Sequence, residues 1–232
     1  MKKILYSVAL AACCMGTMTS CSDFLDASNK SNVTDKQTFA TKEGFNSLVN
    51  DAYQHLQNVY AAPLFTSCFS AGTDMYADAR NKMNEALNTY ETLTPENTDI
   101  KNLYTYLYSG IRAANSVSYY AQTAQVDEKT KGQLVGEARV LAAYEYYLLV
   151  NNFGGVPIMK DFLTTAGTGY PKSSAADVYA YIISELEDVI GKNVLQASTA
   201  TKGGGRISQE TAKAILAKTY LSAAWDLNKQ EY

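Results

Sequence analysis

The sequence predicts an all-α protein, and two observations carry this prediction. Apolar residues recur at three- and four-residue spacing over five long stretches, which is the period of an amphipathic helix. Loops rich in Gly, Pro, Ser, Thr and Asn separate these stretches, and such residues end helices. The predicted helices cover residues 42–60, 99–121, 127–152, 174–190 and the segment that follows Ser208.

The stretch from Glu137 to Pro157 carries the strongest helical signal. It begins with a single apolar stripe, and from Tyr144 onward it is apolar nearly all round, which is typical of a helix packed on several sides. It ends at Gly154 and Gly155, because glycine adopts positive φ without a steric clash and the following proline cannot continue a helix.

Residues 1–20 have the order of a secretory signal peptide. Lys2 and Lys3 give the positive start, and an apolar run from Ile4 to Cys14 follows. This run is shorter than the roughly 20 apolar residues of a transmembrane helix. Small residues then lead to Cys21, which resembles a bacterial lipobox. We therefore expect Cys21 to be lipidated and to hold the mature protein at a bilayer; the alternative is a secreted protein whose cysteine falls there by chance.

Residues 21–40 are polar and predict a tether between the anchor and the folded domain. The helix over 42–60 follows, with His55 near the edge of its apolar stripe. His55 is the sole histidine of the sequence, so no second histidine is present to complete a zinc site. We therefore favour a structural role for it over a catalytic or metal-binding role.

The stretch 61–98 is the least regular part of the chain and holds the candidate binding residues. A loop here carries two carboxylates, a tyrosine and an arginine, namely Asp74, Tyr76, Asp78 and Arg80. Loops on a rigid scaffold are where binding residues gather, so we assign these four as candidate ligand-binding residues. For each residue alone, the alternative is a solvated turn in which Asp74 or Asp78 caps the next helix.

Two features of the middle helices need an explanation. Tyrosines line the helix over 99–121 at helical spacing, a pattern that belongs to a core more often than to a ligand platform. Glu145 projects from the apolar face of the helix over 127–152. Because a buried carboxylate needs a partner or a raised pKa, we expect Glu145 to form a structural ion pair with Arg112.

The last two helices have clear start signals. Ser173 or Ser174 is the expected cap of the helix over 174–190, with Asp177 in its first turn, where the helix dipole favours an acidic residue. Ser208 is the expected cap of the final helix.

The composition of the chain argues against several classes of function. The 232 residues carry a net charge of −3, and loss of the two leader lysines leaves 18 basic and 23 acidic residues, so nothing favours nucleic-acid binding. Of four cysteines, Cys68 alone lies beyond the leader and the lipidation site, which excludes an intramolecular disulfide and a cysteine metal cluster. No nucleophile motif with a base and no nucleotide-binding glycine pattern is present. We therefore expect no catalytic residue, cofactor or metal.

Four segments resemble one known family in matching order. Residues 137–157 combine a Glu-Ala-Arg start, a Tyr-rich middle and an Asn-Phe-Gly-Gly-Val-Pro exit, and they resemble the central helix of the SusD/RagB family. Residues 21–26 (Cys-Ser-Asp-Phe-Leu-Asp) resemble the start of mature members. Residues 170–186, and residues 205–221 with their Gly-Arg-Ile-Ser start, resemble later parts of the same family.

The resemblance implies both a fold and a cellular location. It implies degenerate tetratricopeptide-like helical hairpins with long irregular loops over residues 41–232. Family members are commonly more than twice this length, so we expect this domain to be incomplete at its C-terminus. The resemblance also implies an outer-membrane lipoprotein, and the acidic residues after Cys21 resemble a signal for export to the cell surface.

The resemblance further implies capture of a polysaccharide or oligosaccharide and its delivery to a SusC-like TonB-dependent transporter. Two alternatives stay open: a RagB-like lipoprotein that captures peptides, and a helical-repeat scaffold whose partners are proteins alone. The 18 tyrosines do not choose between them, because tyrosine suits sugar surfaces, peptide surfaces and helix packing alike.

Overall fold

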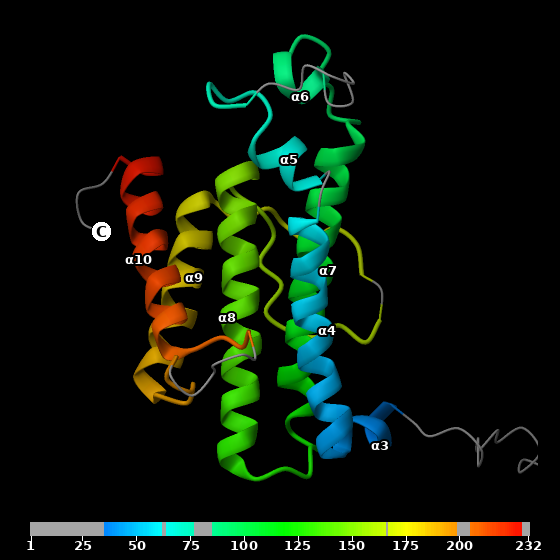
Figure 1. Cartoon of the computed structure of the whole chain (residues 1–232). Coiled ribbons are helices and arrows are strands. Elements are labelled where there is room, and N and C mark those ends of the chain that lie inside the picture. The colour runs from blue at the N-terminus through cyan, green and yellow to red at the C-terminus, as the bar shows by residue number, and fades with distance from the viewer. Residues whose placement is uncertain (1–34, 62–63, 77–84, 166, 199–204, 229–232) are drawn as a thin grey trace, which may run out of the picture. The chain divides into compact units, whose positions relative to one another are not determined.

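The computed structural model describes residues 35–61, 64–76, 85–165, 167–198 and 205–228. This part of the chain folds as a set of α-helices joined by loops, with one isolated bridge between Thr73 and Tyr76 (Figure 1). The predicted all-α class is therefore confirmed.

In the part of the chain that the structure describes, five long helices form the bundle and match the five predicted stretches. Three short helices of the same part accompany them. The long helices are α4 (Lys42–Tyr60), α7 (Thr98–Tyr120), α8 (Glu128–Phe153), α9 (Ala175–Lys192) and α10 (Gln209–Asp226). The short helices are α3 (Asp35–Ala40), α5 (Leu64–Phe69) and α6 (Glu85–Thr89).

The helix ends confirm the predicted caps. Ser174 begins α9 in a capping box with Asp177, which decides between the two expected serines, and Ser208 accepts a hydrogen bond from the backbone N–H of Thr211 at the start of α10. Gly154 ends α8 with φ of +67°. Gly155 is needed for close approach, because a Cβ there would lie 2.2 Å from the Ser173 carbonyl oxygen.

Successive long helices run antiparallel and pack side by side. Helix α7 packs between α4 and α8, α9 packs against α8, and α10 packs against α9 (Figure 1). The hairpins α7–α8 and α9–α10 confirm the tetratricopeptide-like arrangement. The partner of α4 is α7, so the segment with α5 and α6 is an excursion between two helices that pack together.

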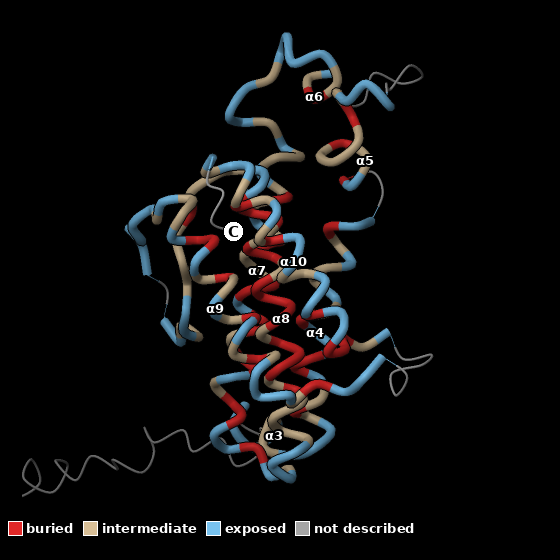
Figure 2. The backbone as a smooth tube through the Cα atoms, turned by 90° about the vertical axis from the view of Figure 1, so that its left-hand side faces the viewer, coloured by how far each residue is buried: buried red, intermediate tan, exposed pale blue. Residues whose placement is uncertain are grey.

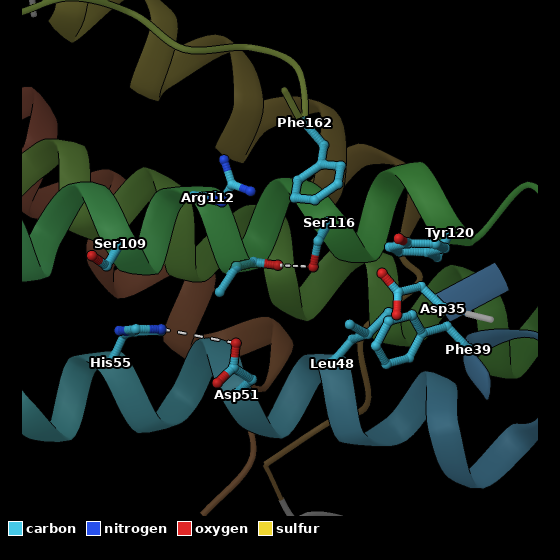
Figure 3. Close-up of a pocket in the computed structure, with 11 residues that line it drawn as sticks. Asp35, Phe39, Leu48, Asp51, His55, Ser109, Arg112, Ser116, Tyr120 and Phe162 are labelled. Atoms are coloured by element: carbon cyan, nitrogen blue, oxygen red, sulfur yellow. Dashed lines mark hydrogen bonds and ion pairs between the residues drawn. The ribbon is translucent and has the colours of Figure 1, made fainter. Parts of the chain in front are cut away.

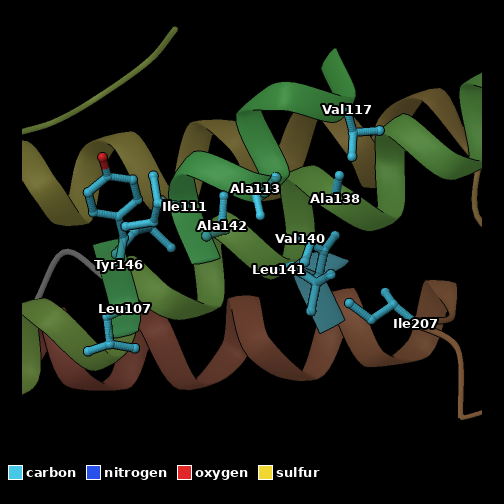
Figure 4. Packing of buried hydrophobic residues seen from close by; sticks show 14 of the residues in the cluster. Leu107, Ile111, Ala113, Val117, Ala138, Val140, Leu141, Ala142, Tyr146 and Ile207 are labelled. Carbon is cyan, nitrogen blue, oxygen red and sulfur yellow. The ribbon is translucent and has the colours of Figure 1, made fainter. Parts of the chain in front are cut away.

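Helix α8 is the centre of the core. Buried residues cover nearly all of its circumference, which explains why it lacks a single apolar stripe (Figure 2). Leu107 and Ile111 of α7 and Leu141 and Tyr146 of α8 lie in one contiguous apolar cluster (Figure 4). Small residues such as Ala138 and Ala142 let neighbouring helices approach α8 closely.

One stretch is more ordered than the sequence predicts. The last six residues of the expected tether form α3, and its Phe39 packs against Tyr120 with ring centroids 4.8 Å apart. The tether prediction was therefore wrong for Asp35–Ala40, because Phe39 supplies an apolar contact. The signal peptide and Cys21 lie outside the described residues.

A buried ion pair joins three segments that are distant in the sequence. Glu137 of α8 is fully buried, and its Oε2 lies 2.7 Å from Nε of Arg206. The Tyr53 hydroxyl of α4 donates to the same oxygen at 2.8 Å and accepts from the backbone N–H of Ile207 at 2.8 Å. Gln133 donates to the other oxygen at 3.0 Å, so both carboxylate oxygens are satisfied.

Removal of Arg206 should be strongly destabilising, because it leaves the Glu137 carboxylate buried without its counter-ion. We expect Arg206→Ala to lower the free energy of unfolding by about 3 kcal/mol. The matched control is Lys192→Ala, which breaks an exposed pair with Asp188 and should cost less than about 1 kcal/mol. Urea denaturation measures the free energy of unfolding of both variants. If Arg206→Ala and Lys192→Ala lose the same amount, the buried pair does not stabilise the fold more than an exposed one.

The expected ion pair between Glu145 and Arg112 is not formed, and that prediction was wrong. Arg112 donates from Nη1 to the Leu163 carbonyl at 3.2 Å, and its guanidinium lies over the Phe162 ring at 5.0 Å. Glu145 is fully buried, and neither of its oxygens has a hydrogen-bond partner in the described part of the chain. Its carboxyl group lies against Gly110, where a Cβ would be 1.7 Å from Oε1.

Burial raises the pKa of Glu145 well above its ordinary value, and this makes folding pH-dependent. Between the ordinary pKa of about 4.3 and the raised one, the folded state binds more protons than the unfolded state. The free energy of unfolding should therefore fall as pH rises through this window, by up to about 1.4 kcal/mol per pH unit. Glu145→Gln should remove this dependence and stabilise the protein near neutral pH.

Urea denaturation between about pH 4 and pH 8 tests this expectation. Glu96→Gln is the control, since Glu96 is exposed. If the free energy of unfolding changes with pH in the same way in the wild type and in Glu145→Gln, the Glu145 carboxyl group does not titrate as its burial requires.

Candidate ligand-binding site

Exposed aromatic side chains gather at one end of the bundle, which we call the aromatic end. It comprises the C-terminus of α4, helices α5 and α6 and the turn after α5 (Figure 1). Its aromatic members are the exposed Tyr60, Phe65, Tyr76 and Tyr90 and the partly buried Phe69. The Phe65 ring lies 5.3 Å from that of Tyr60 and 5.4 Å from that of Phe69, so these three rings form one cluster.

Tyr90 is held at this end by an unusual backbone conformation. It follows α6 with φ of +63°, a region that bulky residues rarely adopt. Its side chain is 57% exposed, and its hydroxyl donates to the Gly72 carbonyl at 3.3 Å. Gly72 has φ of +74°, and a Cβ there would lie 2.3 Å from the Tyr90 hydroxyl. The turn and the tyrosine therefore position each other, and the ring is presented to solvent.

A cavity of about 410 Å³ lies beside Tyr90, between α5, α6, α7 and the end of α8. Its walls mix apolar and polar groups, including Cys68, Leu103, Phe153 and two amides. The amide nitrogens of Asn151 and Asn152 donate to backbone carbonyls of their own helix at 2.6 and 2.7 Å. These bonds fix both side chains and do not use the amide oxygens, which are good acceptors for hydroxyl groups.

Of the four residues proposed from the sequence, two lie in the described part of the aromatic end. Asp74 is exposed in the turn that follows Gly72, and Tyr76 is 41% exposed at its end. The backbone N–H of Tyr76 donates to the Thr73 carbonyl at 3.4 Å, which closes the turn. Asp78 and Arg80 lie outside the described residues.

Sequence reasoning missed most of the aromatic end. Phe65 and Phe69 stand four residues apart, which is helical spacing, but α5 is too short for its period to be recognised. Tyr90 and the two asparagines carry no local signal, because their proximity to Gly72 and Cys68 arises from tertiary packing.

A second cavity, of about 400 Å³, lies between α3, α4 and α7 (Figure 3). His55 and Asp51 line one wall, with Nε2 of His55 3.8 Å from the Asp51 carboxylate. The aromatic rings here already pack against other groups: Tyr120 against Phe39, and Phe162 against Arg112. The aromatic end is therefore the better candidate, because four of its rings are exposed.

Neither cavity carries a group of side chains that could hold a metal ion. In the described ranges, no group of three or more His, Cys, Asp or Glu side chains is placed to hold a metal ion. Burial raises the pKa of the Cys68 thiol to about 11, so it is protonated near neutral pH. The same ranges contain no helix with the length and apolar character that spanning a bilayer requires.

Comparison with known proteins gives a consistent answer. A SusD-like family model, described as starch-binding and associating with the outer membrane, matches residues 23–221. The SusD-like protein P38 of Formosa agariphila is 28% identical over 179 residues, which is 75% of this chain and 34% of that protein. A SusD-like protein of Bacteroides ovatus is 25% identical over 212 residues, which is 89% of this chain and 37% of that protein.

A solved structure shares the fold. The surface glycan-binding protein A from Bacteroides uniformis aligns with a TM-score of 0.66 and 26% identity, over 77% of this chain and 41% of that one. The chain spans about a third of the length of the two curated relatives that it matches.

Proposed function

Because the chain belongs to the SusD-like family associated with the outer membrane, we propose that it captures a glycan at its aromatic end. The observation that carries this proposal is the exposed ring of Tyr90 beside a cavity that holds two fixed amides. Aromatic faces contact the apolar faces of sugar rings, and amide oxygens accept hydrogen bonds from sugar hydroxyls. The turn with Asp74 and Tyr76 would add a carboxylate and a second ring.

We propose binding without catalysis. Glycoside hydrolysis needs two carboxyl groups at a set separation across the sugar. At the turn after Gly72, Asp74 is the one carboxylate among the candidate binding residues that the structure describes. The cavity beside Tyr90 is lined by residues that include two amides, a thiol and apolar groups. This composition favours holding a ligand over cleaving it.

A peptide is the alternative class of ligand, because fixed amide groups also form hydrogen bonds with peptide groups. A glycan is favoured because four exposed rings stand at the aromatic end, and aromatic faces suit the apolar faces of sugar rings. The family is described as starch-binding and the Bacteroides uniformis protein as glycan-binding, which supports the same choice.

The proposal predicts that Tyr90→Ala weakens glycan binding about tenfold, which corresponds to roughly 1.4 kcal/mol. The mature protein would be tested by calorimetry against starch, a soluble β-glucan and a mixture of oligopeptides. Tyr170→Ala is the matched control, because Tyr170 is likewise exposed, at 41%, but belongs to the loop before α9.

The outcomes separate the alternatives. Binding to a glycan that Tyr90→Ala weakens and Tyr170→Ala does not would support the site. Binding to peptides alone would favour the RagB-like alternative, and absence of binding to every probe would favour a scaffold with protein partners. Equal loss in both variants would place the site elsewhere.

We further propose that Cys21 carries the lipid anchor, that the domain faces the cell exterior, and that captured glycan passes to a SusC-like TonB-dependent transporter. The association of the family with the outer membrane supports this placement. Acyl chains on a cysteine hold a soluble domain at a bilayer stably when more than one chain is attached.

Cys21→Ala tests the anchor and the partner together. In cells fed with radiolabelled palmitate, we expect the wild-type protein to carry label and the variant to carry none. Cross-linking on intact cells should join the wild type, but not the variant, to a large barrel protein. Cys68→Ala is the control and should retain both signals; label on the Cys21→Ala protein would contradict the assigned anchor.

A further inference from the structure

The second cavity, between α3, α4 and α7, carries charged side chains of both signs (Figure 3). Asp35 of α3 and Asp51 of α4 line it with carboxylates, and Arg112 of α7 lines it with a guanidinium. It shares no lining residue with the cavity beside Tyr90. The glycan proposed for the aromatic end therefore leaves these charges without a role.

The guanidinium of Arg112 is held in place but keeps most of its donors. Its Nη1 donates to the Leu163 carbonyl at 3.2 Å, and its plane lies over the Phe162 ring at 5.0 Å. Among the residues that the structure describes, Arg112 forms no ion pair. An arginine has five N–H donors in a planar fork, which pairs with a carboxylate through two parallel hydrogen bonds. Arg112 is therefore oriented and still able to bind a carboxylate.

The two carboxylates of the cavity have no lysine or arginine partner within the described ranges. Asp51 is 60% exposed and lies 3.8 Å from Nε2 of His55, which is a counter-ion only when it is protonated. Asp35 forms no ion pair with a described residue. Carboxylates accept hydrogen bonds and attract cations, so both are suited to bind ammonium groups.

Apolar surface lies along the cavity between the two carboxylates. Leu48 lies on α4 three residues before Asp51, on the side toward α3, which bears Asp35 (Figure 3). Phe39 of α3 also lines this part. The cavity thus offers Asp51 and Asp35 on either side of an apolar stretch, with Arg112 on the facing helix.

We propose that the second cavity binds a free diamino acid such as lysine, independently of the glycan. Such a molecule carries one carboxylate and two ammonium groups, which complement the one guanidinium and two carboxylates of the cavity. Its carboxylate would pair with Arg112 and its adjacent α-ammonium with Asp51. Its aliphatic chain would lie along Leu48, and its terminal ammonium would reach Asp35.

Other classes of small ligand fit these walls less well. An anion would meet two carboxylates, and a diamine without a carboxylate would leave Arg112 unpaired. A neutral sugar would need a free aromatic face, but Tyr120 packs against Phe39, and Phe162 packs against Arg112. The volume of about 400 Å³ is in the usual range of small-molecule sites.

The first test compares ligands on the wild-type mature protein by calorimetry. L-lysine is titrated beside three analogues that each lack one charge. Lysinamide lacks the carboxylate, Nα-acetyl-L-lysine lacks the α-ammonium, and L-norleucine lacks the terminal ammonium. We expect each analogue to bind about tenfold more weakly than lysine. Absence of lysine binding at millimolar concentration, or an analogue that binds as tightly as lysine, would overturn the proposal.

The second test pairs each charge of the ligand with one side chain. Arg112→Gln should bind lysine no better than lysinamide, and Asp51→Asn should bind it no better than Nα-acetyl-L-lysine. Asp35→Asn should bind lysine no better than L-norleucine. A merely structural role for these side chains would instead weaken all four ligands alike, and that result would contradict the assignment.

Two exposed charges on the same helices serve as controls. Lys101 of α7 and Glu43 of α4 are exposed and do not line the cavity. Lys101→Gln and Glu43→Gln should keep the full preference for lysine over its analogues. Losses as large as those of the cavity variants would assign the effect to the net charge of the protein and overturn the site. If a cavity variant does not fold, the analogue series on the wild type decides alone.

Competition separates this site from the aromatic end. Tyr90→Ala should leave lysine affinity unchanged, and saturating starch or β-glucan should not displace lysine. Displacement would place lysine in the glycan site and overturn a separate site. Because lysine binding is measured without a glycan, its result is independent of whether the aromatic end binds one.

Discussion

The described structure depends on one buried charge. Glu137 lies in the middle of the core, where an isolated carboxylate would be costly, and it is tolerated because Arg206, Tyr53 and Gln133 reach it together. Arg206 precedes α10, and Tyr53 belongs to α4. The carboxylate is therefore satisfied in one arrangement of the helices, and this requirement selects that arrangement from others that would bury similar apolar area.

The long helices could be predicted because their signals are local. Residues 42–60 and 174–190 show an apolar stripe within the segment itself, and the serine caps and Gly154 mark the boundaries. The central position of α8 could be predicted for the same reason, because α8 is apolar nearly all round over several turns, which a surface helix is not.

The features that sequence reasoning missed are set by tertiary packing. The partner of Arg112 is a loop carbonyl, and the space for Glu145 is provided by Gly110, a residue on another helix. Neither relation leaves a pattern along the chain. The same holds for the candidate site, where Tyr90 meets Gly72 across 18 positions of sequence, and where helices as short as α5 and α6 show too few turns for a period to be seen.

The excursion between α4 and α7 has a consequence for how such proteins diversify. Since α4 and α7 contact each other directly, the chain that connects them can change in length and composition while the scaffold keeps its geometry. Exchanged side chains at the exposed positions of this segment would leave the contacts between α4 and α7 intact, whereas Leu64 and Leu87 of the same segment are buried. The exposed residues of this segment and the contacts between α4 and α7 therefore lie in different stretches of the chain, so that a change in one need not alter the other.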